Sequence, residues 1–262
     1  MIKALSSLRC VFALFIFFHH FRYGSIGNIF PAGGDCGVAF FFILSGFAMC
    51  IGYKKTILNG EISFKEFFLK RIAKLLPLHV LSFLCALYLY GGISPANMLQ
   101  WLANLFLVQS WIPVESYYFS GNAVGWCLSD FMFFYLLFPF LIKCMNGRRT
   151  MFLSVFCALV SILIGLSAVI PQDYRVALVY INPAVRLLDF IFGMVLYEFV
   201  YGSQRINHLV RIAGTRMCWI ELSAISLLFI SIVGYNWVQS NELSLSLSLS
   251  LSLSTGGRFS PC

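Results

Sequence analysis

The feature that most constrains this chain is a series of long apolar runs, separated by short loops that hold most of its charged residues. Each run has about 20 residues, the length that a helix needs to cross a hydrocarbon layer of about 30 Å. Of the 262 residues, 60% are hydrophobic and 11% charged, against roughly 25% charged in a soluble domain. The sequence therefore predicts an all-α, polytopic transmembrane helix bundle with about seven spanning helices. The predicted spans are 4–22, 36–52, 75–91, 126–143, 150–170, 177–199 and 217–238.

Lysine and arginine residues gather in alternate loops, and this pattern predicts the orientation of the bundle. The basic loops hold Lys54, Lys55, Lys65, Lys70, Arg71 and Lys74, then Lys143, Arg148 and Arg149, then Arg205, Arg211 and Arg216. The intervening loops, 24–35, 92–125 and 171–176, have few or none. By the positive-inside rule the amino terminus is cytoplasmic. The net charge of +8 is then a mark of membrane topology, so we expect no nucleic-acid binding.

The character of the chain changes after Glu242, because six Leu-Ser repeats occupy Leu243–Ser254. A lone strand with this alternation would leave its backbone unpaired in a bilayer, so we expect a low-complexity, disordered segment. We therefore divide the chain into a membrane domain, 1–242, and a tail, 243–262. A CT dinucleotide tract would encode the repeat and change length during replication. One hypothesis is that residues 255–262 follow a change of frame, and the alternative is a genuine short tail.

Arg9 and His20 are the most informative residues of the first predicted span, because ionisable groups within a membrane are costly and usually functional. Eleven positions separate them, which is about 1100° of helical rotation, so both side chains fall within about 20° of one face. They are separated by about 16 Å along the axis, with Arg9 toward the cytoplasm. The alternative is that Arg9 extends to lipid phosphates and His20 sits at the outer interface. His19 points about 100° away from His20 and is not expected to share its role.

Five motifs follow one another along the chain in the order typical of one family of membrane enzymes. They are Ser7-Leu8-Arg9 with His20, GVAFFFILSGF at 37–47, FLKRIAKLLP at 68–77, WCLSD with FYLLFP at 126–139, and NP with RLLDFIFGM at 182–194. Together they resemble the acyltransferase family 3 membrane proteins over residues 5–238. The resemblance implies a longer bundle, so the domain 1–242 is expected to be incomplete at its C-terminal end. In the fourth motif a Glu usually occupies the place of Phe131, and Asp130 is expected to take over part of its role.

The resemblance implies transfer of an acyl group, usually acetyl from cytoplasmic acetyl-CoA, to a hydroxyl of an envelope glycan. The acceptor would be a polysaccharide, a lipopolysaccharide or a lipid-linked sugar, and the enzyme a multi-pass protein of the inner membrane in contact with lipid. The expected catalytic residues are His20, Arg9 and Asp130. The expected acyl-CoA contacts are Arg9, Lys70, Arg71 and Lys74, whose cations suit phosphate groups. No permanently bound cofactor and no metal are expected.

Several roles stay open at this point. A neutral His20 is able to accept a proton from a sugar hydroxyl as a general base, or to form a covalent acyl-histidine. Asp130 and Asp189 are each expected to pair with a cation such as Arg186 or with backbone donors. Trp126 is expected at the outer interface. The outer stretch 97–110 is expected on or partly in the membrane, and Asn104, Gln109, Trp111 and Tyr117 are candidates for a glycan surface.

Two other functions compete with active acyl transfer. A transporter would use the same Arg, His and Asp residues as a proton relay or substrate site, but the two halves of the chain show no internal repeat. The other alternative is an inactive, truncated product of an acyltransferase gene that switches on and off.

Overall fold

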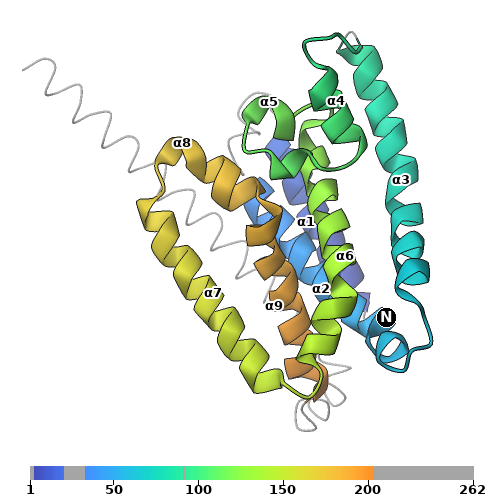
Figure 1. Cartoon of the computed structure of the whole chain (residues 1–262), viewed down its shortest axis with the longest axis vertical. Helices are drawn as coiled ribbons and strands as arrows, with labels where there is room; N and C mark the ends of the chain where they lie inside the picture. Colours follow the sequence, from blue (N-terminus) through green and yellow to red (C-terminus); the bar gives the residue numbers. More distant parts are fainter. Residues whose placement is uncertain (1–2, 21–32, 91, 203–262) are drawn as a thin grey trace, which may run out of the picture. The chain divides into compact units, whose positions relative to one another are not determined.

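The computed structural model describes residues 3–20, 33–90 and 92–202 (Figure 1). Two compact units share the chain, Met1–Phe41 with His208–Cys262, and Phe42–Asn207. The described residues form helices and turns without a strand, which confirms the all-α prediction. The predicted span 217–238 and the tail 243–262 lie outside the described residues.

Helices account for most of the described chain. In order they are α1 (Lys3–His20), α2 (Gly33–Leu58), α3 (Phe64–Leu89), α4 (Met98–Leu105), the 3-10 turn η2 (Gln109–Trp111), α5 (Glu115–Tyr118), the 3-10 turn η3 (Ala123–Gly125), α6 (Trp126–Met145), α7 (Arg149–Val169), α8 (Gln172–Arg175), the π-helix η4 (Val176–Ile181) and α9 (Pro183–Gly202).

Three described helices are long and apolar enough to cross a membrane, namely Cys36–Leu58, Phe64–Leu89 and Ala123–Met145. A fourth crossing is formed if the bent pair Asp173–Ile181 and Pro183–Gly202 is one span. Two shorter apolar helices, Ser7–His20 and Thr150–Leu166, coincide with further predicted spans. The described chain thus agrees with a helical membrane protein, while the total of about seven spans stays a prediction.

The first unit is held together by aromatic side chains of α1 and of the first turns of α2. The rings of Phe12 and Phe40 are stacked, with centroids 3.8 Å apart. Phe12 and Phe15 are buried, and Leu8, Val11 and Phe41 pack against them. The phenylalanine-rich motif in α2 therefore serves as the packing surface for the helix that carries Arg9 and His20.

The second unit has a core of phenylalanine rings contributed by four helices. Phe42 of α2, Phe67 of α3, Phe134 of α6 and Phe190 of α9 have no exposed surface. The Phe134 ring lies 5.1 Å from both Phe42 and Phe190. Rings at such distances pack edge to face or offset, an arrangement that adds to the burial of apolar area. Figure 1 shows α6 and α9 running side by side, and α3 also packs against α6.

Helix α3 begins at Phe64, well before the predicted start of the span at residue 75. The Ser63 side chain caps the helix by accepting a hydrogen bond from the Glu66 backbone amide at 3.2 Å, and Glu66 places a carboxylate in the first turn, as helix dipoles favour. Hydropathy marks only the apolar part of a helix, so the basic first turns were missed. Lys70, Arg71 and Lys74 thus lie on a helix that continues into the predicted membrane span.

The predicted span 177–199 is two helical segments that meet at Asn182-Pro183 with a bend of 42°. Pro183 is the first residue of α9, where its missing N–H is tolerated. The Asn182 side chain accepts a hydrogen bond from the Ala184 amide at 2.9 Å and so caps α9. Arg186 Nε donates to the Tyr180 carbonyl at 2.6 Å, which satisfies an oxygen near the break.

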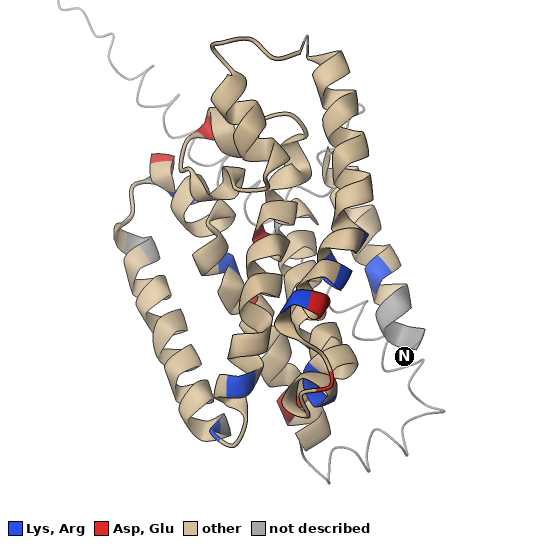
Figure 2. Ribbon diagram, turned by 45° about the vertical axis from the view of Figure 1, so that its right-hand side comes forward, with Lys and Arg blue, Asp and Glu red and all other residues tan. Residues whose placement is uncertain are grey.

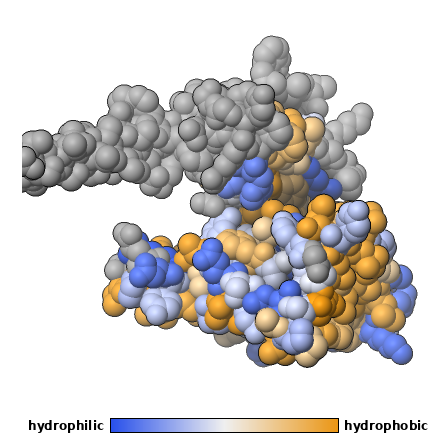
Figure 3. Space-filling model, turned by 90° about the horizontal axis from the view of Figure 1, so that it is seen from above, coloured by the Kyte–Doolittle hydropathy of each residue, from blue (hydrophilic) through white to orange (hydrophobic). Residues whose placement is uncertain are grey.

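Charged and apolar residues of the second unit are unevenly distributed. Lys and Arg gather around the α2–α3 and α6–α7 connections, at the end opposite α4 and α5 (Figure 2). Figure 3 views the molecule from the end that carries α4 and α5. Hydrophilic and apolar residues are mixed on this surface, and the side where α3 lies is mainly hydrophobic. This distribution agrees with the predicted orientation, in which the basic end is cytoplasmic.

Candidate active site

The predicted site residues are divided between the two units. Arg9 and His20 both lie on α1 in the first unit. The described part of α1 is one continuous helix between them, which confirms the premise that they share a helix. Arg9 is half-buried and His20 is exposed. Lys70, Arg71 and Asp130 belong to the second unit, so we describe them separately.

The two neighbouring histidines have different surroundings. The His19 ring packs against the backbone of α2 at Gly34, where an added Cβ would lie 2.6 Å from His19 Cδ2. The His20 ring lies 5.0 Å from the His19 ring, edge to face, and is exposed. His19 therefore packs against α2, whereas His20 is exposed.

The basic residues of α3 also differ from one another. Lys70 is exposed and forms an ion pair with Glu66 one turn away, at 2.7 Å, a type of surface pair that contributes little stability. Lys74 is exposed. Arg71 is half-buried, and its guanidinium lies 4.3 Å from the ring centroid of Tyr53 and 5.8 Å from that of Tyr135. Two aromatic faces thus hold the Arg71 cation in one orientation.

Arg71 also keeps binding capacity in this position. Its buried Nε has no hydrogen-bond partner among the described residues. A guanidinium has five N–H donors in a fixed fork, which matches the oxygens of a phosphate or carboxylate. Of the three predicted cations of α3, Arg71 is therefore the one whose side chain is held in a defined orientation with an unpaired donor among the described residues.

Asp130 lies in the first turns of α6 with no exposed surface. Neither of its carboxylate oxygens has a hydrogen-bond partner among the described residues, and those residues offer it no ion pair within 4 Å. Among the described residues Asp130 thus has no hydrogen-bonded cation or backbone donor, and its pairing with a cation or with backbone donors stays a prediction. Leaving a buried polar group unpaired costs about 1–3 kcal/mol, and more for a charge.

The arginine expected to pair with Asp130 is held elsewhere. Arg186 Nη1 donates to Asp189 Oδ2 at 3.0 Å, which confirms the predicted pairing of Asp189. The same guanidinium donates to the Tyr180 carbonyl and lies 4.6 Å from the centroid of the Tyr180 ring. These contacts keep Arg186 at the bend before α9, because the carbonyl near the break and the Asp189 carboxylate both require a donor.

Other buried polar residues lie on η2 and in the first turn of α6, two elements that pack against each other. Gln109 and Ser110 of η2 and Ser129 of α6 are 0–2% exposed. The Ser110 hydroxyl is a neighbour of the Asp130 carboxylate and donates to Ser129 Oγ at 2.6 Å. The Gln109 side-chain amide has no partner for its nitrogen or its oxygen among the described residues. Sequence spacing gives no indication of this cluster, because it depends on how the segment before α6 folds back.

The outer segment is more buried than predicted. Asn104 is 2% exposed and donates to the Ser120 carbonyl at 2.6 Å, so it supports the fold of the segment. Trp126 is 4% exposed, with its ring 5.1 Å from that of Tyr180, so its predicted place at an interface is wrong and it belongs to the core. Burial, and then the Glu115 carboxylate, raise the pKa of Tyr118, which keeps the phenol protonated.

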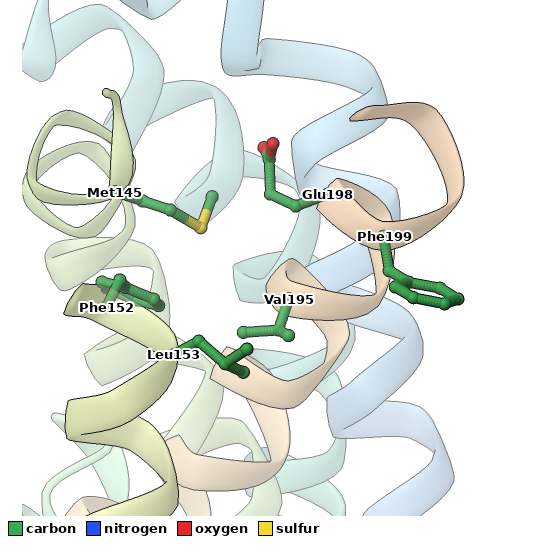
Figure 4. Close-up of a pocket in the computed structure, with 6 residues that line it drawn as sticks. All are labelled: Met145, Phe152, Leu153, Val195, Glu198 and Phe199. Carbon is green, nitrogen blue, oxygen red and sulfur yellow. The ribbon is translucent and has the colours of Figure 1, made fainter. Parts of the chain in front are cut away.

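Figure 4 shows a small cavity at the basic end of the second unit, with Met145, Leu153 and Val195 pointing toward one another. Its volume is about 60 Å³. Its one charged lining residue, Glu198, forms an ion pair with Lys54. The cavity has room for a few water molecules and is too small for the arm of an acyl-CoA.

Comparison with known proteins assigns the family. The family model of acyltransferase family 3, described as an acyltransferase domain, matches residues 2–260. The matched range continues past residue 242, and the domain boundary placed there stays a prediction.

The chain is also similar to the acyltransferase MdmB of Streptomyces mycarofaciens, with 28% identity over 182 residues. The aligned part is 62% of this chain and 46% of MdmB, so the chain spans about half the length of this relative. No solved structure matches. The chain belongs to acyltransferase family 3, a family of membrane enzymes of the O-acyltransferase type.

Proposed function

We propose that this protein transfers an acetyl group from cytoplasmic acetyl-CoA to a hydroxyl of an envelope polysaccharide, lipopolysaccharide or lipid-linked sugar, as a multi-pass protein of the inner membrane. The observation that carries the proposal is the family match over residues 2–260, with Arg9 and an exposed His20 on one helix. The proposed catalytic residues are His20, Arg9 and Asp130.

In the proposed reaction, the acceptor hydroxyl oxygen attacks the thioester carbonyl carbon as His20 removes the hydroxyl proton. A carbon–oxygen bond forms, the carbon–sulfur bond breaks, and the CoA thiolate leaves and takes up a proton. In the other route His20 first becomes acetylated and then passes the acetyl group to the hydroxyl. An acetylated peptide containing His20, isolated after incubation with acetyl-CoA alone, would identify the second route.

The proposed donor contacts are Arg9 on α1 and Lys70, Arg71 and Lys74 on α3. Support comes from Arg71, which is fixed between two tyrosine rings and retains a free donor. CoA carries several phosphate charges, and charge-assisted hydrogen bonds from guanidinium or ammonium groups are the strongest that proteins offer them.

The test is transfer of labelled acetyl from acetyl-CoA to envelope glycan in membranes that contain the protein. His20→Ala is expected to abolish transfer, whereas His19→Ala is expected to retain activity per molecule because His19 packs against Gly34. Transfer that survives His20→Ala would rule out His20 as base or nucleophile. A transporter would leave no acetyl label covalently attached to the glycan.

The Leu-Ser repeat supports a second proposal, in which a CT tract of variable length switches the gene between an active enzyme and an inactive, shortened product. Its repeating pair of residues is what such a tract encodes. The nucleotide sequence of this region from independent colonies is the test. Variable tract lengths are expected, and a fixed tract of mixed Leu and Ser codons would exclude the switch.

A further inference from the structure

We infer that Gln109 and Asp130 form a binding site for a hydroxyl group of the acceptor, and that Gln109 determines which acceptor is used. The inference rests on the proposed function and extends it to Gln109, a residue outside the family motifs. Gln109 lies on η2 and Asp130 on α6, two elements that pack against each other. Both side chains have no exposed surface.

Four polar side-chain atoms lack a hydrogen-bond partner among the described residues of η2 and α6. Both oxygens of Asp130, and the nitrogen and oxygen of the Gln109 side-chain amide, are without hydrogen bonds among the described residues. Buried polar groups in native proteins are nearly always paired. A buried group that lacks a partner therefore often has a functional role. The Ser110–Ser129 hydrogen bond joins the two residues into one cluster, because Ser110 follows Gln109 and Ser129 precedes Asp130.

The four atoms, two carboxylate oxygens of Asp130 and the amide nitrogen and oxygen of Gln109, suit a hydroxyl ligand. A hydroxyl is both a donor and an acceptor, so it is able to donate to the Asp130 carboxylate and accept from the Gln109 amide nitrogen. The amide oxygen is then available to a neighbouring hydroxyl, as a sugar provides. A metal cation would use the three oxygens but would leave the amide N–H groups without an acceptor. The cluster therefore matches a polyhydroxylated ligand better than an ion.

The backbone just before Gln109 has an unusual conformation. Leu107, two residues earlier, has a φ of 55°, a left-handed conformation that is rare for a side chain of this kind. Leu107 is also buried, at 4% exposure. Such conformations persist where the surrounding structure enforces them, and they concentrate at functional sites. Gln109 follows this turn, and its amide nitrogen lies 3.6 Å from the position of a Cβ added to Gly125, the residue before α6.

The site is also placed to admit a ligand from the end that carries α4 and α5. Gln109 and Asp130 are fully covered, so a ligand reaches them when η2 moves away from α6. A change of φ at Leu107 would relieve the strain and move η2. By the positive-inside rule this end faces away from the cytoplasm, where an envelope glycan is presented.

The experiment compares the wild-type protein with Gln109→Leu and Asp130→Asn, all purified into lipid nanodiscs. Gln100→Leu is the matched control, because Gln100 is a half-buried glutamine of the same segment outside the cluster. The first measurement is the shift in thermal unfolding caused by methyl glycosides of glucose, galactose, mannose and rhamnose. The second is the KM for isolated envelope glycan and, separately, for acetyl-CoA.

At least one glycoside is expected to raise the unfolding temperature of wild type and Gln100→Leu, but not that of Gln109→Leu or Asp130→Asn. Gln109→Leu is expected to raise the KM for glycan at least about tenfold and to leave the KM for acetyl-CoA unchanged. Its unfolding temperature without ligand should not fall, because leucine removes an unpaired amide.

Three results would overturn the inference: no glycoside shifts the wild type, the shift persists in Gln109→Leu, or sodium chloride produces it in place of glycosides. Failure of the proposed function has a different signature. If the wild-type protein transfers no acetyl group but the glycoside-induced shift in unfolding temperature depends on Gln109, the sugar site is supported and the enzyme assignment is wrong. If the protein transfers acetyl groups but Gln109→Leu changes neither the glycoside-induced shift in unfolding temperature nor the KM for glycan, the enzyme assignment is supported and the proposed site is wrong.

Discussion

Gly46 and Gly193 lie at one crossing of α2 and α9, and each lies against the backbone of the other helix. A Cβ added to Gly46 would be 2.0 Å from the Phe190 carbonyl oxygen, and one added to Gly193 would be 1.9 Å from the Ile43 carbonyl oxygen. Small residues permit such contact between membrane helices, where dispersion forces and weak Cα–H···O contacts replace the hydrophobic effect. Gly46 of the second motif therefore has a packing role.

Gly193→Ala is expected to lower the free energy of unfolding by about 1–3 kcal/mol, because the backbones must separate to admit the methyl group. Thermal unfolding in detergent or nanodiscs measures the effect. Gly52→Ala is the matched control on α2, since nothing lies within 4 Å of its added Cβ, and it should be neutral or slightly stabilising. Equal effects of the two substitutions would contradict the close crossing.

Arg186→Gln is expected to destabilise the protein by about 1–3 kcal/mol, because the Tyr180 carbonyl and the Asp189 carboxylate lose their donor. In a double-mutant cycle with Asp189→Asn, a coupling energy of about 1 kcal/mol should be measured. Arg148→Gln, at an exposed arginine, should change stability by less than about 0.5 kcal/mol. Strict additivity in the cycle would show that the ion pair is not formed.

Arg71→Ala is expected to raise the KM for acetyl-CoA about tenfold or more without changing the KM for glycan, since a hydrogen bond to a charged group contributes about 1.5–3 kcal/mol. Lys70→Ala should have a smaller effect, below about fivefold, because Lys70 is exposed and paired with Glu66. Lys55→Ala, at an exposed lysine of α2, serves as the control. An equal response of all three variants would indicate general attraction rather than a defined contact.

Asp130→Asn is expected to raise the free energy of unfolding by about 1–2 kcal/mol while it lowers transfer, because it removes a buried, unpaired carboxylate. Denaturation curves and transfer rates on the same preparations measure both quantities. Asp173→Asn, at an exposed position of α8, should leave stability within about 0.5 kcal/mol. A loss of stability in Asp130→Asn would mean that the carboxylate has a structural partner.

Apolar runs were sufficient to predict where most described helices lie. The predicted span 126–143 corresponds to α6, Trp126–Met145, and 150–170 to α7, Arg149–Val169. Hydropathy failed where a helix continues beyond the apolar layer, as at the start of α3, and where a run contains a break, as at Pro183. Proline alone does not decide this, because Pro77 and Pro139 lie inside continuous helices.

The site was predictable where spacing along one helix defines it, as for Arg9 and His20. Asp130 was recognised from its motif, but its lack of a partner among the described residues depends on the contacts that hold Arg186 near the bend. The Gln109 contact requires the fold of the segment between α3 and α6. That segment contains Leu107 in a left-handed backbone conformation, which the local sequence does not predict.

The ion pair between Lys54 and Glu198 joins residues 144 positions apart in the chain. At a translation rate of about 5–20 residues per second, Lys54 is made on the order of 10 s before its counterion. In the predicted orientation Lys54 is an uncompensated positive charge near the end of α2 during that interval, and we expect it to help to retain that end in the cytoplasm. Glu198 then neutralises the same charge as α9 docks. We therefore expect one lysine to act first as a topology signal during insertion and later as a partner in an ion pair of the folded protein.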